Sequence, residues 1–107
     1  MIKVSVLYPK TAASTFDMGY YLKSHIPMIR ETLAPAIRNV AVEEGVGGGA
    51  PGSAPTYAVM CHLYFDSVDA FQKAFDPHAG PIMGDIANYT NVQPIVQISE
   101  VKIAATA

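Results

Sequence analysis

The residues best suited to chemistry lie in one stretch, Phe16–Pro27, where two tyrosines are followed by a histidine and a proline. Side chains four positions apart share a face of a helix, so Tyr21 and His25 are expected to stack one turn apart, beside an apolar row of Phe16 and Tyr20. Histidine titrates near neutral pH and can pass a proton to or from a phenolic or enolisable substrate. His25 is therefore the candidate catalytic residue. The alternative is a packed histidine bonded to a backbone carbonyl that the proline leaves free.

Neighbouring tyrosines and a second histidine are candidates for contacting a ligand. Tyr20 and Tyr21 could orient a ligand through their rings and hydroxyl groups, although aromatic residues at helical spacing more often belong to a core. His62 and Tyr64 occur together in a later apolar stretch. His62 could face a pocket together with His25, or lie buried at a subunit interface. Ligand contact and packing are both open for these residues.

The second half of the chain adds two ligand-binding candidates and one cysteine. His78 lies in a turn-forming stretch and could border a pocket mouth, although a turn residue is the plainer interpretation. Asp85 and Asn88 fall three apart on an expected short helix and could bind a polar group of a substrate, with capping and surface solvation as the alternatives. Cys61 is the only cysteine, and a thiol in an apolar strand is expected to pack without reacting.

The sequence predicts no metal and no cofactor. Its three histidines lack the spacing of metal ligands, and there is no cysteine pair. The segment Gly45-Val-Gly-Gly-Gly-Ala50 matches a dinucleotide-binding fingerprint, but phosphate binding there requires a following helix, which Pro51 and Pro55 forbid. Any chemistry is therefore expected to come from side chains alone.

Composition restricts the class of protein. Of the 107 residues, half are hydrophobic and 15% are charged, which is typical of a globular domain. A formal net charge of -2 and scattered lysines and arginines argue against a nucleic acid partner. No run approaches the roughly 20 apolar residues of a membrane-spanning helix, and Met1–Lys10 does not resemble a signal peptide, so a cytoplasmic location without membrane contact is expected. A domain this small and apolar is expected to form a homo-oligomer.

Period-two alternation of apolar residues predicts four strands. The third strand has two apolar faces and should lie centrally, whereas the second should lie at an edge. The glycine- and proline-rich segment Gly47–Pro55 is expected to form a loop between them. The predicted strands cover Ile2–Pro9, Ile37–Val46, Tyr57–Phe65 and Val92–Ile103.

Helices are predicted between these strands. The first begins at a cap on Ser14 or Thr15, is disturbed by Pro27 near residues 24–26, and ends at about Leu33 before Pro35.

The second helix begins at a cap on Asp66 or Ser67 and ends at Asp76-Pro77, with an apolar face that includes Phe71 and Phe75. A further short helix is expected over Ile82–Tyr89.

This order of elements is typical of an α+β fold, the ferredoxin-like split β-α-β sandwich with a four-stranded antiparallel sheet. Two main helices cover one face of such a sheet. The other face is left bare, so two sheets are expected to pack face to face in a homodimer.

Two motifs in this framework resemble the EthD family, named after ethyl tert-butyl ether degradation. They are Phe16…Tyr20-Tyr21…His25-Ile26-Pro27 and Asp85-Ile-Ala-Asn-Tyr-Thr90. The resemblance covers essentially the whole chain, and it implies a single EthD-like domain over residues 1–107 that forms a dimeric α+β barrel. That superfamily includes cofactor-free monooxygenases, haem-degrading enzymes, muconolactone isomerases and polyketide cyclases. The Gly47–Pro55 insertion departs from the family pattern.

Two functional hypotheses follow from the residues and the resemblance. In the first, the protein binds a hydrophobic, partly oxygenated small molecule and acts as a cofactor-independent oxidoreductase, isomerase or cyclase through His25. In the second, it is a non-catalytic accessory or ligand-carrier protein for an oxidase partner of the cytochrome P450 type. Fold alone does not decide between them.

Overall fold

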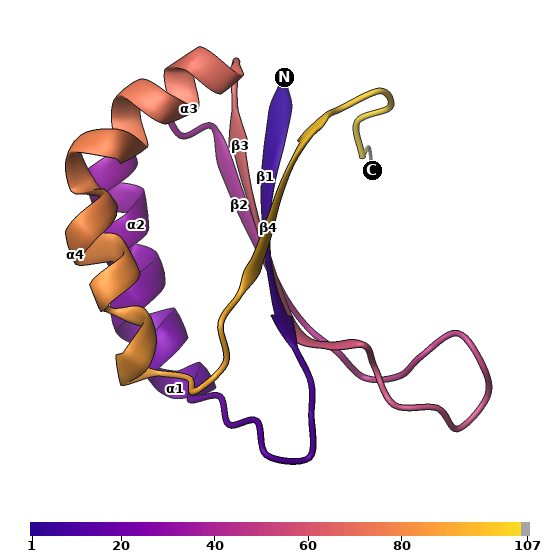
Figure 1. The fold of residues 1–107 in the computed structure, drawn as a ribbon. Helices are drawn as coiled ribbons and strands as arrows, with labels where there is room; N and C mark the ends of the chain where they lie inside the picture. Colours follow the sequence, from indigo (N-terminus) through magenta and orange to yellow (C-terminus); the bar gives the residue numbers. More distant parts are fainter. Residues whose placement is uncertain (106–107) are drawn as a thin grey trace.

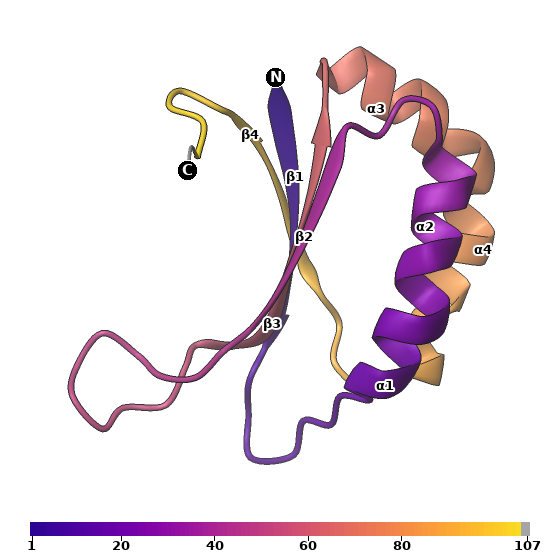
Figure 2. The same cartoon turned by 180° about the vertical axis from the view of Figure 1, so that it is seen from behind.

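The computed structural model describes residues 1–105 and contains one four-stranded antiparallel sheet with all helices on one of its faces (Figures 1 and 2). The order of strands across the sheet is β2-β3-β1-β4, so β3 is central and β2 lies at an edge, as predicted. This confirms the α+β class and the split β-α-β arrangement. The strands are β1 (Ile2–Pro9), β2 (Asn39–Glu44), β3 (Tyr57–Phe65) and β4 (Ile95–Glu100).

Strands β1 and β3 have the predicted bounds, whereas β2 and β4 are shorter than predicted. Before β2, the backbone amides of Ala36 and Ile37 both bond to the carbonyl of Leu33, in a turn over residues 34–36, and the strand starts only at Asn39. Strand β4 pairs only with β1, from Leu7 opposite Ile95 to Ile2 opposite Glu100. Beyond Glu100 the amide of Val101 still bonds to the carbonyl of Met1, the residue before β1 begins.

The first helical segment is continuous but changes type twice. It consists of α1 (Met18–Tyr20), a π-helical turn (Tyr21–His25) and α2 (Ile26–Leu33). Pro27 lies in the first turn of α2, and its ring would crowd the carbonyl four residues earlier in an unbroken α-helix. The wider π turn relieves that contact, so the disturbance predicted near residues 24–26 is confirmed.

The predicted start of this helix was wrong. Asp17 is the N-cap, and its carboxylate accepts a hydrogen bond from the Tyr20 amide at 3.0 Å. Ser14 instead bonds within a separate turn to Thr11. Phe16 is outside the helix, in an isolated bridge with Thr90, so it does not form a helical row with Tyr20.

The second helical segment lies between β3 and β4. Its first helix, α3 (Val68–Phe75), is capped by Ser67, one of the two predicted caps. A 3-10 turn (Asp76–His78), α4 (Ala79–Gly84) and a second 3-10 turn (Ile86–Asn88) follow. The predicted short helix therefore starts three residues earlier than expected and changes to a 3-10 turn.

The core lies between the helices and the covered face of the sheet. On β3, Val59, Cys61, Leu63 and Phe65 are buried, and they alternate with half-buried residues on the other face. Burying a large apolar side chain contributes about 1.5–3 kcal/mol, so this face supplies much of the stability of the fold. Homodimerisation through the uncovered face stays a prediction.

The segment between β2 and β3 extends away from the sheet as a long loop (Figure 1), as its composition predicted. Gly52 has a φ of +77°, which favours glycine. A Cβ at Gly45 would collide with the carbonyl oxygen of Tyr57. Among the described residues, no helix is long and apolar enough to cross a membrane. Residues 106–107, the last of the predicted domain, lie outside the described part.

Candidate functional site

His25 is held by a carboxylate from the other helical segment. Its Nδ1 lies 2.8 Å from Oδ2 of Asp85, and the histidine is only 5% exposed. Because a carboxylate can only accept, Nδ1 donates this bond and the proton of the neutral ring resides there. Nε2 therefore carries a lone pair and can act as a hydrogen-bond acceptor or a base. The alternative interpretation from the sequence, a histidine bonded to a backbone carbonyl that the proline leaves free, is wrong, because the partner of Nδ1 is a carboxylate.

Asp85 accepts two more hydrogen bonds. The hydroxyl of Tyr20 donates to Oδ1 at 2.6 Å, and the side-chain amide of Asn88 donates to the same oxygen at 2.9 Å. Burial alone would raise the pKa of the Asp85 carboxyl, but these hydrogen bonds and that of His25 outweigh burial and hold the pKa below its usual range. Asp85 is therefore ionised at neutral pH, which keeps the proton on Nδ1.

Two tyrosine hydroxyls continue this chain of hydrogen bonds on the far side of the ring. The Tyr89 hydroxyl lies 3.5 Å from Nε2 of His25 and 2.7 Å from the Tyr8 hydroxyl. Burial raises the pKa of both tyrosines. For Tyr89, the hydrogen bond with the Tyr8 hydroxyl raises the pKa further. Tyr21 stacks on His25 with 5.3 Å between ring centroids and an interplanar angle of 16°. The predicted stacking of these two rings one turn apart is confirmed.

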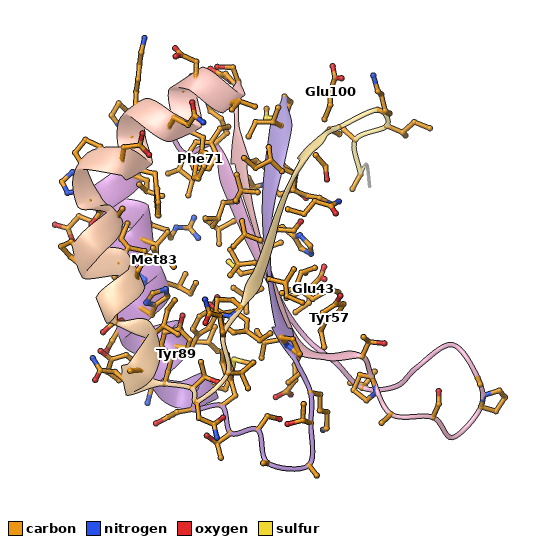
Figure 3. All side chains as sticks on the ribbon, viewed as in Figure 1. Glu43, Tyr57, Phe71, Met83, Tyr89 and Glu100 are labelled. Carbon is orange, nitrogen blue, oxygen red and sulfur yellow. The ribbon has the colours of Figure 1, made fainter. Side chains whose placement is uncertain are left out.

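His25 is one of the residues that line a cavity of about 350 Å³ between the helices and the covered face of the sheet. This volume is within the range of small-molecule sites. Val4 and Tyr8 both line it, and strand geometry separates them by about 13 Å, so the cavity is elongated. In Figure 3, the labelled Phe71, Met83 and Tyr89 follow one another down the helical side.

The polar groups are concentrated at one end of this cavity. The hydroxyls of Tyr8 and Tyr89 and the His25 ring make up that end, and apart from Asp76 the rest of the lining is apolar. The cavity is also lined by Val4, Val6, Tyr21, Ile26, Ile29, Leu33, Cys61, Phe75, Asp76, Ile82, Met83, Ile86, Pro94 and Val96. It suits an elongated apolar molecule with a polar group at one end.

The structure brings only some of the predicted site residues together. Tyr20 and Asp85 join His25 in one hydrogen-bonded group, and Tyr21 packs against the ring. His62 lies on the other face of the sheet, where it bonds Ser5 and Glu43 and does not line the cavity with His25.

Tyr64 has the same strand parity as His62 and also faces away from the helices. His78 is an exposed residue of the 3-10 turn after α3 and does not line the cavity. The site as built in the structure therefore omits both residues. Ligand contact by them stays a prediction without geometric support.

The remaining reactive group near the cavity is the Cys61 thiol. Burial raises its pKa, and a hydrogen bond with Tyr21 only partly offsets this. A protonated thiol is a poor nucleophile, so Cys61 is a packing residue. Among the described residues, no three histidine, cysteine, aspartate or glutamate side chains are grouped to hold a metal ion.

The comparisons with known proteins identify the family. Residues 11–93 match the model of the EthD domain, which is more than half of the chain. The chain belongs to the EthD family. No curated protein sequence matches it. The solved structure of an EthD-like protein from Ralstonia eutropha JMP134 has 42% sequence identity and a TM-score of 0.93 with this EthD protein. The match covers 98% of the chain of this EthD protein and 95% of the Ralstonia chain.

More distant structures share the fold alone. An ethyl tert-butyl ether degradation (EthD) family protein from Bacillus halodurans C-125 is 24% identical, with a TM-score of 0.70 over 94% of this chain and 98% of that one. A candidate monooxygenase from Shewanella loihica PV-4 is 13% identical, with a TM-score of 0.61 over 96% and 95% of the two chains. These two likenesses show only that this EthD protein shares its fold with both structures.

Sequence reasoning missed Tyr8 and Tyr89 as members of the site of this EthD protein. Tyr8 occupies a regular inward position of β1, and Tyr89 follows the last 3-10 turn, so both read as core residues. The available signal was chemical. Tyrosine carries a hydroxyl that needs a partner when buried, and two inward tyrosines next to one histidine can supply partners to one another.

Proposed function

We propose that this EthD protein binds a hydrophobic, partly oxygenated small molecule in the cavity and transfers a proton to or from it through His25. The observation that carries the proposal is the Asp85–His25 pair, because it leaves the Nε2 lone pair available on a residue that lines a largely apolar cavity. A base within an apolar enclosure meets little competition from water. Removal of a proton next to a carbonyl is a step with which cofactor-independent oxidation, isomerisation and cyclisation can each begin.

The Asp85 carboxylate supports this role in two ways. It fixes the ring orientation and the tautomer, and it stabilises the imidazolium that forms when Nε2 takes a proton. The arrangement needs no nucleophile from the protein, in keeping with the raised pKa values of the Tyr8, Tyr89 and Cys61 side chains. Residues from both helical segments and the sheet contribute to it.

The proposal is tested by hydrogen–deuterium exchange at the α-carbon of 2-tetralone, an apolar enolisable ketone, followed by NMR in D₂O. The wild-type protein should accelerate exchange, and His25→Ala should reduce the acceleration about 100-fold or more, since general base catalysis contributes on that scale. The matched control is His62→Ala, which removes the histidine on the uncovered face of the sheet and should leave the rate unchanged. Thermal unfolding of both variants establishes that they fold.

The alternative is a non-catalytic carrier that delivers its ligand to an oxidase. It is favoured by the predominance of apolar side chains in the cavity lining, which suits binding without chemistry. The same experiment separates the two functions. Binding of 2-tetralone without faster exchange supports the carrier, whereas loss of exchange in His25→Ala with binding retained supports catalysis.

A further inference from the structure

The protons at the polar end of the cavity have defined directions. Nδ1 of His25 donates to Asp85, so Nε2 can only accept. If the Tyr89 hydroxyl donates to Nε2, its oxygen is free to accept from Tyr8, 2.7 Å away. The order of donation is then Tyr8 to Tyr89 to His25 to Asp85. A chain aligned in this way strengthens each of its members.

One link in this chain is weak. The distance of 3.5 Å between Tyr89 and Nε2 exceeds the usual length of an O–H···N bond, whereas the Tyr8–Tyr89 and His25–Asp85 bonds are short. Within residues 1–105, Nε2 has no other hydrogen-bond partner. A buried acceptor usually has a well-aligned donor at a shorter distance. Nε2 can therefore accept a stronger hydrogen bond from a ligand in the cavity.

The charges around the cavity select against an anionic ligand. Asp85 already places a negative charge behind His25, and the exposed residue Asp76 is among those that line the cavity. The lining residues include no lysine or arginine. A carboxylate ligand would have to enter this apolar space without a permanent cation to pair with, which is costly.

We propose that the ligand is an uncharged phenol or enol whose hydroxyl group donates to Nε2 of His25 and accepts from Tyr89, with its apolar body directed along the cavity toward Phe71. Tyr89, positioned by Tyr8, is then the residue that distinguishes a hydroxyl group from an ether or a carboxylate. This inference rests on the proposed function and names the chemical class of its ligand. Because burial raises the pKa of both tyrosines, they stay protonated and remain donors.

The proton transfer that this geometry permits is balanced. The O–H bond of the ligand breaks, the N–H bond at Nε2 forms, and the electron pair stays on the ligand oxygen. No oxidant or reductant is needed. The resulting imidazolium lies between the Asp85 carboxylate and the new oxyanion, which Tyr89 stabilises by donating a hydrogen bond.

Four probes built on one ring system test the inference by calorimetry on the wild-type protein. They are 2-naphthol, which also mimics the enol of 2-tetralone, 2-methoxynaphthalene, 2-naphthoate and naphthalene. The expected result is that 2-naphthol binds about tenfold more tightly than each of the other three, the equivalent of roughly one to two good hydrogen bonds. Equal or tighter binding of 2-naphthoate overturns the inference.

Tyr89→Phe and a matched control identify the residue responsible. Tyr89→Phe keeps the ring and removes the hydroxyl, so 2-naphthol should bind about tenfold more weakly while naphthalene binds as before. The control, Tyr57→Phe, removes the hydroxyl of a tyrosine outside the cavity lining and should change neither affinity. An unchanged preference for 2-naphthol in Tyr89→Phe overturns the role given to Tyr89.

Failure of this inference can be told apart from failure of the proposed function. If all four probes bind equally, and the cavity-filling variant Val6→Phe abolishes their binding, the cavity is a ligand site but the selection for a hydroxyl group is refuted. If no probe binds the wild-type protein, both the inference and the proposed ligand-binding function are refuted. The comparison of probes on one unaltered protein does not depend on any variant folding.

Discussion

Two histidines of this molecule, on opposite faces of one sheet, have similar bonding partners. His25 lies between the Asp85 carboxylate at 2.8 Å and the Tyr89 hydroxyl at 3.5 Å. His62 lies between the Ser5 hydroxyl at 2.8 Å and the Glu43 carboxylate at 3.2 Å. A carboxylate and a hydroxyl flank the ring in both places.

The difference lies in what surrounds each ring. Both nitrogens of His62 have a protein partner within 3.2 Å, and its carboxylate partner is 52% exposed, so solvent screens the pair. Figure 3 shows Glu43 on the side of the sheet away from the helices. Asp85, by contrast, has a side chain that is only 17% exposed. His25 lines the cavity, and its Nε2 has only a weak hydrogen-bond partner, the Tyr89 hydroxyl at 3.5 Å. A histidine–acid pair alone therefore does not identify the candidate site. What identifies it is a ring nitrogen with a weak hydrogen-bond partner on a residue that lines the cavity.

The largest expected effect contrasts the two faces of β3 in stability. Phe65→Ala on the covered face should lower the free energy of unfolding by about 3–5 kcal/mol, because it removes a fully buried ring and leaves a void. Met60→Ala on the open face should cost about 1 kcal/mol. Urea denaturation measures both. Equal costs would show that the open face is covered in solution, and a cost for Met60→Ala that grows with protein concentration would assign that cover to a second copy.

The next prediction reverses the chemistry at His25. In Asp85→Asn, the new side-chain amide can donate to Nδ1, which moves the ring proton to Nε2 and turns that atom from an acceptor into a donor. The preference for 2-naphthol over 2-methoxynaphthalene should then fall about tenfold. The tautomer itself is read from ¹⁵N chemical shifts of the imidazole. A retained Nδ1–H tautomer would contradict the role given to Asp85.

Asp85 should also leave a mark on the pH dependence of stability. Its pKa is lowered in the folded protein, so its stabilising contribution is present above the unfolded pKa of about 3.9 and is lost as the pH falls through the folded value. Wild-type stability should therefore decline in this acidic range more steeply than that of Asp85→Asn. Denaturation curves at a series of acidic pH values make the comparison.

The smallest expected effect is at the second histidine. Glu43→Gln should change the free energy of unfolding by less than about 1 kcal/mol, because the lost interaction is exposed and screened. Affinity for 2-naphthol should stay within about twofold of the wild-type value, since Glu43 is outside the cavity lining. A larger loss of stability than in Asp85→Asn would break the contrast between the two histidines.

The parts of the fold that sequence predicted well are those governed by local rules. Alternation in β1 and β3, the stop at Pro35 and the cap at Ser67 all depend on neighbouring residues. The cap at Asp17 was missed because Ser14 and Thr15, just before it, offer side-chain oxygens equally suited to capping. Only the bridge between Phe16 and Thr90, a long-range contact, decides where the helix can begin.

The candidate site could be predicted only in part for the same reason. Tyr21 and His25 are neighbours on one helix, so their stacking followed from spacing. Asp85 is sixty positions away, and its bond to His25 depends on how the second helical segment packs against the π turn. His62 was left ambiguous because both faces of β3 are apolar, so alternation alone did not show which face the helices cover.

The tyrosines around His25 provide an intrinsic fluorescence signal for ligand binding. The chain contains six tyrosines and no tryptophan, so its ultraviolet emission comes from tyrosine alone. Tyr8, Tyr21 and Tyr89 line the cavity, and Tyr20 is hydrogen-bonded to the carboxylate behind the histidine. A molecule entering the cavity changes the surroundings of half of the emitting side chains. Ligands that do not themselves absorb at the wavelength that excites tyrosine can thus be followed by tyrosine fluorescence on unlabelled protein.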